Sequence, residues 1–182
     1  MKKMTRVLRF ALVTLCMLSP LSARAQSRSA TAQSLLGVWE LVSSEDRDAS
    51  GDISYWLGPH PTGTITYSSS GRMAVQFMRD PRPVVSTPNA WQGLRPSPAV
   101  TEDELRGILS GYYAYFGTYD VDESRHAVLH HVKASLRPSE VGLDYVRPFE
   151  LDGDNLILRY PAAIDGRPTT RTIKWIRTQE IR

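Results

Sequence analysis

Gly37-Val38-Trp39 and Lys174-Trp175-Ile176-Arg177 decide the fold of this chain. In a closed β-barrel the first strand pairs with the last strand. A Trp indole on one of these strands can then lie under an Arg guanidinium from the other, held by cation–π contact and by burial of apolar area. The two stretches therefore predict an antiparallel sheet that closes on itself.

Residues 1–25 have the parts of a secretory signal peptide. Basic residues precede an apolar stretch from Phe10 to Leu18, which is too short to span a bilayer. Ala23-Arg24-Ala25 then fits an A-x-A cleavage site. We expect cleavage near Ala25/Gln26, a periplasmic or secreted protein, and no integral membrane segment after cleavage.

Composition bears on the expected partners of the mature chain. The predicted signal holds five of the 22 basic residues and none of the 19 acidic ones, which leaves 17 basic against 19 acidic residues. A mildly acidic chain offers no basic face, so we expect no nucleic-acid partner. The only cysteine, Cys16, lies in the predicted signal, so the mature chain is expected to have no disulfide and no thiol chemistry.

The predicted mature chain has room for one domain. Residues 26–34 are small and polar, and they are typical of a disordered leader. Residues 35–182 follow without a second linker or an internal repeat, and a chain of this length can bury a core of its own. We therefore expect one domain over residues 35–182.

The clearest hairpin joins Thr62–Tyr67 to Arg72–Arg79 through a Gly-ended loop. In its second strand Met73, Val75 and Phe77 share one face. In a ligand-binding barrel both faces can be fairly apolar, so the pattern leaves open which face is interior.

A proline-rich segment and a helix interrupt the strands. Residues 80–98 carry five of the twelve prolines, which predicts a loop over the surface or the barrel mouth. Thr101 and Glu104 then form a capping box ahead of a helical apolar stripe. We expect a helix here that can act as a lid.

The remaining pattern predicts short antiparallel strands throughout. The expected strands, besides the hairpin, are 36–44, 53–57, 113–121, 128–136, 144–151, 155–160 and 169–177. Their number and even spacing favour an all-β fold, an up-and-down antiparallel β-barrel of eight to nine strands with one inserted helix. An immunoglobulin-like sandwich is the alternative.

From Leu35 to Arg177 the chain resembles the lipocalin-like domains of the bacterial and fungal calycin type. The resemblance is carried by residues 35–43 (LLGVWELVS), the hairpin at 63–79 with the DPRP sequence that follows, residues 113–119 (YAYFGTY), His130-His131-Val132 with Ala134-Ser135, and Trp175. It implies a β-barrel with a small-molecule cavity and implies no uniform reaction.

His130 and His131 are the first candidates for chemistry. Neighbouring residues of a strand point to opposite faces, so only one of the two can face the barrel interior. Val128 and Val132 would accompany His130, and this more apolar set favours His130 as the interior residue. An interior His would anchor a ligand or act as a general base. The alternative is a buried His bonded to a Tyr hydroxyl in a filled core.

Other candidates come from neighbouring strands. Tyr113, Tyr115 and Tyr119 are expected beside the interior His. Arg147 shares a strand face with Tyr145, Phe149 and Leu151. It can fork onto a ligand carboxylate, or it can neutralise a buried acid such as Asp120.

Metal and cofactor sites are not predicted. His126 and His130 are four residues apart, which on one strand is roughly 13 Å and too far to share an ion. No nucleophile motif is present. The acidic pairs Asp46/Asp48, Asp120/Asp122 and Asp152/Asp154 are interpreted as solvated turn residues, and Tyr55, Trp56 and Trp91 as residues that line the mouth or simply pack.

These patterns lead to two functional hypotheses. The first is an exported protein that binds a small, largely apolar molecule with a polar or acidic end. Tyr113, Tyr115, Tyr119, His130 and Arg147 would orient that end, and Met73, Val75 and Phe77 would form the apolar wall. The alternative is an isomerase, cyclase or hydrolase on the same barrel. Its base would be His130 or His131, assisted by a tyrosine such as Tyr119 and by Arg147. Ligand identity and oligomeric state have no sequence signal here.

Overall fold

The structure is a computed structural model that describes residues 29–82 and 84–178. Its helices are α1 (Ala30–Ser34) and α2 (Glu102–Ser110), with short 3-10 turns at Glu123–Arg125 and Pro138–Glu140. Its strands are β1 (Gly37–Arg47), β2 (Ile53–Ser54), β3 (Thr62–Tyr67), β4 (Arg72–Met78), β5 (Trp91–Gln92), β6 (Arg95–Pro96), β7 (Tyr112–Asp122), β8 (Ala127–Ser135), β9 (Asp144–Asp152), β10 (Asn155–Ile164) and β11 (Arg167–Arg177).

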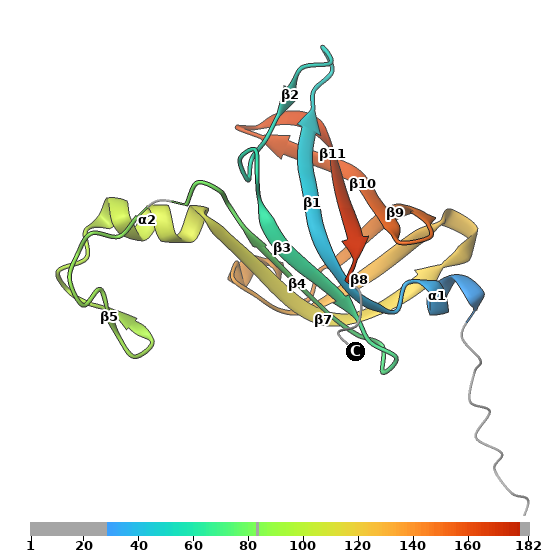
Figure 1. Cartoon of the computed structure of the whole chain (residues 1–182), viewed down its shortest axis with the longest axis horizontal. Coiled ribbons are helices and arrows are strands. Elements are labelled where there is room, and N and C mark those ends of the chain that lie inside the picture. The colour runs from blue at the N-terminus through green and yellow to red at the C-terminus, as the bar shows by residue number, and fades with distance from the viewer. Residues whose placement is uncertain (1–28, 83, 179–182) are drawn as a thin grey trace, which may run out of the picture.

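The long strands form a closed antiparallel barrel (Figure 1). Their order is β11-β10-β9-β8-β7-β4-β3-β1, and β1 also pairs with β11, which closes the circle. β2 extends the sheet from β1 as one extra strand. The predicted all-β barrel with an inserted helix is therefore confirmed, and because the sheet closes on itself the fold is not a sandwich.

Closure depends on the two stretches that the sequence singled out. Trp39 and Arg177 are partners across β1 and β11, and the guanidinium carbon lies 4.0 Å from the centre of the indole ring. The indole nitrogen of Trp39 donates to the Leu35 carbonyl at 3.0 Å. Gly37 has a φ of +123°, and a Cβ there would lie 3.2 Å from Nη1 of Arg177. Glycine at this position therefore leaves room for the arginine that covers the barrel end.

The leader differs from the prediction. Within residues 26–34, which were predicted to be disordered, Ala30–Ser34 form α1. The Ser29 side chain caps this helix by accepting from the Ala32 amide, and Arg177 donates to the Ser34 carbonyl at 2.7 Å. Local capping and the barrel-closing arginine thus order the segment. Residues 26–28 and the predicted signal peptide at 1–25 lie outside the described residues.

β1 is longer than predicted and carries a correction. A register shift between Leu41 and Ser43 lets the strand continue to Arg47 along β11. After this bulge Ser44 and Asp46 face inward, and Asp46 is only 1% exposed. Its interpretation as a solvated turn residue is therefore wrong. The predicted second strand, in contrast, is reduced to Ile53–Ser54.

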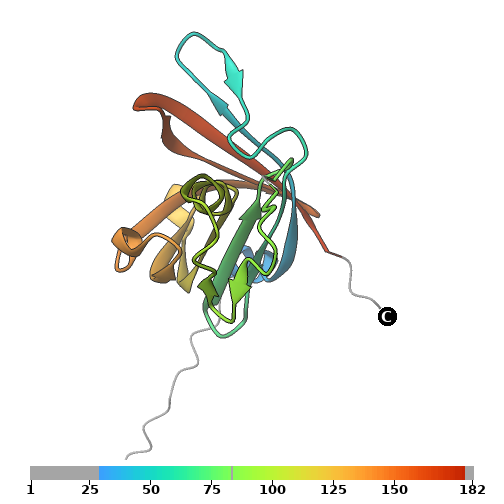
Figure 2. The same cartoon turned by 90° about the vertical axis from the view of Figure 1, so that its left-hand side faces the viewer.

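The proline-rich segment and α2 form an arm beside the barrel (Figures 1 and 2). The capping box is present as predicted, and the Glu104 carboxylate also accepts from the backbone and side chains of Ser86 and Thr87. Hydrogen bonds from Thr101 and Thr87 lower the pKa of Glu104 to about 2. α2 buries none of its residues and extends away from the barrel, so it does not act as a lid in this structure.

Candidate functional site

His130 lies inside the barrel on β8 and is completely buried. Its Nε2 lies 2.8 Å from the Tyr67 hydroxyl, and its Nδ1 lies 2.8 Å from the Tyr115 hydroxyl. Val128 and Val132 are buried on the same side of the strand. The choice of His130 as the interior histidine is therefore correct. Both ring nitrogens are used by tyrosines.

Burial fixes the charge of His130 and of its two tyrosine partners. Burial, with a smaller contribution from Arg147, holds the pKa of His130 well below its usual value, so the imidazole is neutral and has one donor and one acceptor nitrogen. One tyrosine hydroxyl therefore donates to the imidazole and the other accepts from it. The positive charge of Arg147 opposes the effect of burial on the pKa of Tyr115. Burial raises the pKa of both tyrosines, so both hydroxyls keep their protons.

Arg147 is a half-buried cation on the inner face of β9. Its guanidinium carbon lies 4.4 Å from the ring centre of Tyr145 and 3.7 Å from that of Tyr160. None of the ion pairs between described residues includes Arg147. In particular, Asp120, which the sequence offered as a partner, lies on the outer surface beside His131.

Arg171, the other interior arginine, is neutralised by Asp46. Its Nε and Nη2 contact both carboxylate oxygens at 3.0–3.1 Å, and Thr169 donates to the same carboxylate. The guanidinium also lies 4.4 Å from the Trp56 ring centre. Of the three aromatic residues interpreted as lining the mouth or packing, Trp56 therefore packs on an interior group, whereas Tyr55 and Trp91 are about half-exposed.

Tyr113 contributes its ring to the interior and its hydroxyl to a loop. The hydroxyl donates to the Glu140 carboxylate at 2.6 Å, and Ser135 donates to it at 2.7 Å. Burial alone would raise the pKa of Glu140, but the hydrogen bonds from Tyr113, Ser135 and Arg137 lower it. Arg137 pairs with Glu140 and lies over the Tyr113 ring. This cluster fastens the β8–β9 connection to β7.

The remaining predicted ligand residues are buried inside the barrel. Met73, Val75 and Phe77 face inward from β4, which answers the question that the alternation left open. Tyr119 is also interior, but its hydroxyl donates to the Ser68 carbonyl at the β3–β4 turn. Tyr119 is therefore directed toward the turn, whereas the Tyr115 hydroxyl contacts His130.

His131 points to the outside of the barrel. Its Nδ1 lies 2.7 Å from Asp144 and its Nε2 lies 3.0 Å from Asp120, and a quarter of its side chain is exposed. The hydrogen bond to Asp144 is the main reason why the pKa of His131 is raised. The barrel wall therefore separates His131 from the interior groups, so His131 does not fit the role of a base that acts on a ligand inside the barrel.

Replacing His131 with Gln is expected to destabilise the protein by about 0.5 kcal/mol at pH 5.5 and by less at pH 8.5, as measured by urea unfolding. The folded-state pKa is raised, so the stabilisation is complete below the unfolded-state pKa and is lost as the pH rises through the folded-state value. The control is His60→Gln at an exposed loop position. An equal cost at both pH values would show that charge is not involved.

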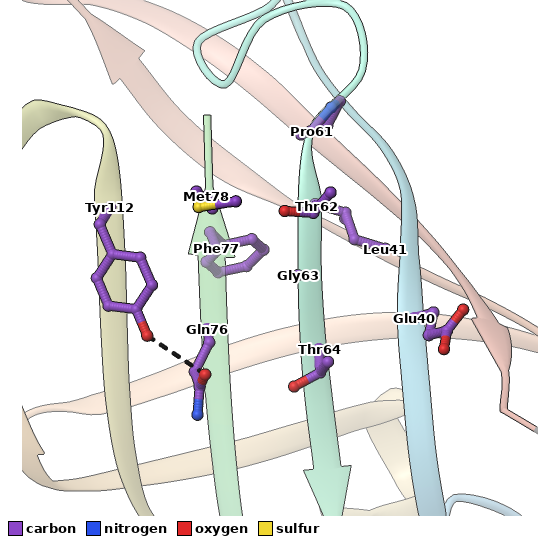
Figure 3. A pocket seen from close by; sticks show the side chains of 10 residues that line it. All are labelled: Glu40, Leu41, Pro61, Thr62, Gly63, Thr64, Gln76, Phe77, Met78 and Tyr112. Atoms are coloured by element: carbon purple, nitrogen blue, oxygen red, sulfur yellow. Dashed lines mark hydrogen bonds between the residues drawn. The ribbon is translucent and has the colours of Figure 1, made fainter. Parts of the chain in front are cut away.

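A groove of about 470 Å³ lies on the outer wall, between β1, β3, β4 and β7 (Figure 3). Gly63 has no side chain there, and Leu41 and Phe77 lie on either side of it. Tyr112 donates to Gln76 across the groove at 3.3 Å. Glu40 is the one charged residue among those that line it, so the groove offers no cation to an acidic ligand.

The described residues contain neither a clustered metal site nor a membrane-spanning helix. Among them, no group of three or more His, Cys, Asp and Glu side chains is placed to hold a metal ion. No helix within the described ranges has the length and apolar character of a membrane span.

Comparison with known protein families identifies the family of this chain. A family model described as a lipocalin-like domain matches residues 36–178, which is nearly the whole barrel. The chain belongs to the lipocalin-like domain family. No curated protein matches it significantly. Similar solved structures include that of the siderocalin Ex-FABP, described as functioning through dual ligand specificities. It shares 10% identity over 82% of this chain and 77% of that chain, at a TM-score of 0.29. A likeness this distant indicates nothing about the ligand.

Several interior residues of this lipocalin-like domain were missed by the sequence reasoning. They are Asp46, Glu140, Tyr160 and Arg171. Arg171 could have been found, because it alternates with the buried Ile173 and Trp175 in a predicted strand. The position of Asp46 depends on the bulge in β1, for which the sequence has no evident signal.

Proposed function

We propose that this lipocalin-like domain binds a small, largely apolar molecule inside its barrel and anchors an acidic end of that molecule on Arg147. One observation carries the proposal: Arg147 is an interior, half-buried cation without a carboxylate partner among the described residues. A cation withdrawn from water gains most from a charged partner that comes with it, and a guanidinium binds a carboxylate through two parallel hydrogen bonds.

The surrounding groups suit this role. Tyr145 and Tyr160 place their rings against the guanidinium. Met73, Val75 and Phe77 supply apolar area inside the barrel from β4. As part of the same proposal, the predicted signal peptide at residues 1–25 would place the protein in the periplasm or outside the cell.

The enzyme alternative receives less support from this geometry. A general base needs a free nitrogen directed at its substrate. Both nitrogens of His130 are within 2.8 Å of tyrosine hydroxyls, and His131 lies on the outer surface. The interior histidine is therefore better suited to orienting Tyr115 than to accepting a proton from a ligand.

The proposal is tested by two measurements on the native protein. Native mass spectrometry followed by denaturation detects a retained small molecule, which we expect to be an acid. Fluorescence titration then compares 11-(dansylamino)undecanoic acid with its methyl ester, and we expect the acid to bind about tenfold or more tightly. Equal affinity for acid and ester, or no saturable binding of either, would contradict the proposed anchor.

A further inference from the structure

At the barrel end opposite Trp39, aromatic rings and arginines form a belt on the inner side. Neighbouring rings are in contact, with centroid separations of 5.9 Å for Trp56–Phe77, 6.1 Å for Phe77–Tyr113, 5.6 Å for Tyr113–Tyr115 and 5.6 Å for Tyr115–Tyr145. Arg147 joins Tyr145 to Tyr160, and Arg171 lies over Trp56. Tyr160 and Arg171 are partners across β10 and β11, so the belt closes on itself.

The belt is partly accessible: Phe77, Tyr113 and Tyr115 are buried, whereas its other members are not. Trp56, Tyr145, Arg147 and Tyr160 are each only partly buried, whereas the next interior residues toward Trp39, such as Leu158 and Ile173, are almost completely buried. A molecule that enters the barrel from the end where β10 and β11 turn therefore meets this layer first. A ligand must therefore be complementary in shape and charge to the residues of this belt.

Charge within the belt amounts to one free cation. Asp46 neutralises Arg171, and Glu140 pairs with Arg137 above the Tyr113 ring. Only Arg147 of these three arginines lacks a carboxylate among the described residues. A single ligand carboxylate would balance it. A second ligand carboxylate would have no cation left and would be repelled by Asp46 or Glu140.

We propose that the aromatic belt selects flat aromatic monocarboxylic acids over saturated acids of equal carbon number and over aromatic dicarboxylic acids. This inference rests on the proposed function, because it takes Arg147 as the carboxylate anchor. Rings gain offset-stacked and edge-to-face contacts with belt members, and these contacts are worth more than the area they bury. A saturated chain gains the area alone and loses rotational freedom when it is ordered.

Calorimetric titration of the native protein with three acids of twelve carbons tests the inference. They are 1-naphthaleneacetic acid, dodecanoic acid below its micelle concentration, and 2,3-naphthalenedicarboxylic acid. We expect 1-naphthaleneacetate to bind about tenfold more tightly than each of the other two. Dodecanoate binding as tightly, with a preference for acid over ester, would overturn the belt inference and leave the proposed function standing. Absence of binding by both monocarboxylates would overturn both. A dicarboxylate preference would overturn the charge argument.

Substitutions in the belt test whether its aromatic rings cause the preference for the aromatic acid. Trp56→Leu is expected to reduce the preference for 1-naphthaleneacetate over dodecanoate about threefold or more while the preference of the dansyl acid over its ester is kept. Tyr160→Leu provides a second position, in case the first variant does not fold. Tyr55→Leu changes the neighbouring, half-exposed aromatic residue and should leave the preference unchanged. An unchanged preference in both belt variants would contradict the inference.

Discussion

Replacing Arg147 with Met is expected to weaken binding of 11-(dansylamino)undecanoic acid about 30-fold and to leave binding of its methyl ester nearly unchanged. Hydrogen bonds to a charged group contribute about 2 kcal/mol when the site is shielded from water, which corresponds to this factor. Met keeps the length of the side chain and can still pack against Tyr145 and Tyr160. The substitution therefore removes the charge and the donors while much of the apolar contact is retained.

The control for this prediction is Arg159→Met. Arg159 lies on β10 but points outward, where it pairs with Glu150. The same chemical change outside the barrel should leave both affinities at their native values. Equal loss of affinity for the acid and the ester in Arg147→Met would show that Arg147 shapes the interior by packing, and the anchor role would be wrong.

Much of the fold could be predicted because its signals are local. The alternation in 72–79 and the loop before it defined the β3–β4 hairpin, and Thr101 with Glu104 defined the start of α2. Barrel closure was predicted from Trp39 and Arg177, since a Trp near one end and an Arg near the other make sense together only if their strands meet. The apolar neighbours at i±2 favoured His130 as the interior histidine but left the choice between His130 and His131 to the structure.

The parts that could not be predicted depend on register between strands distant in the sequence. Asp46 reaches Arg171 only because β1 contains a bulge and runs antiparallel to β11 in one particular register. Glu140 reaches Tyr113 because the β8–β9 connection folds back over β7. Neither pairing has a fixed spacing along the chain. The charge balance that distinguishes Arg147 from Arg171 is therefore a property of the fold, and the sequence alone left the role of Arg147 open.

His130 is expected to make the protein less stable in mild acid. Its folded-state pKa lies well below the usual value because of burial, so the unfolded chain binds a proton that the folded protein does not. The stabilisation is present above the unfolded-state pKa near 6.5 and is lost as the pH falls toward the folded-state value. Between pH 7.5 and 5 the free energy of unfolding should fall by about 2 kcal/mol. His131 acts in the opposite direction, so the slope is best measured by urea unfolding of His131→Gln.

Two further variants separate this titration from packing. His130→Leu, made in the His131→Gln protein, removes the titrating group and should abolish the slope between pH 7.5 and 5. It should also cost about 2 kcal/mol at pH 7.5, because the buried Tyr67 hydroxyl loses the only hydrogen-bond partner it has within residues 29–82 and 84–178. Adding Tyr67→Phe to His130→Leu removes the second member of that hydrogen bond as well. Since replacing both partners by apolar groups is nearly neutral, the double change should recover part of the stability lost in the single one.

A slope that persists without His130 would assign the acid sensitivity to carboxylates. No recovery in the double change would mean that His130 stabilises the barrel through its volume and that its hydrogen bond to Tyr67 adds nothing measurable.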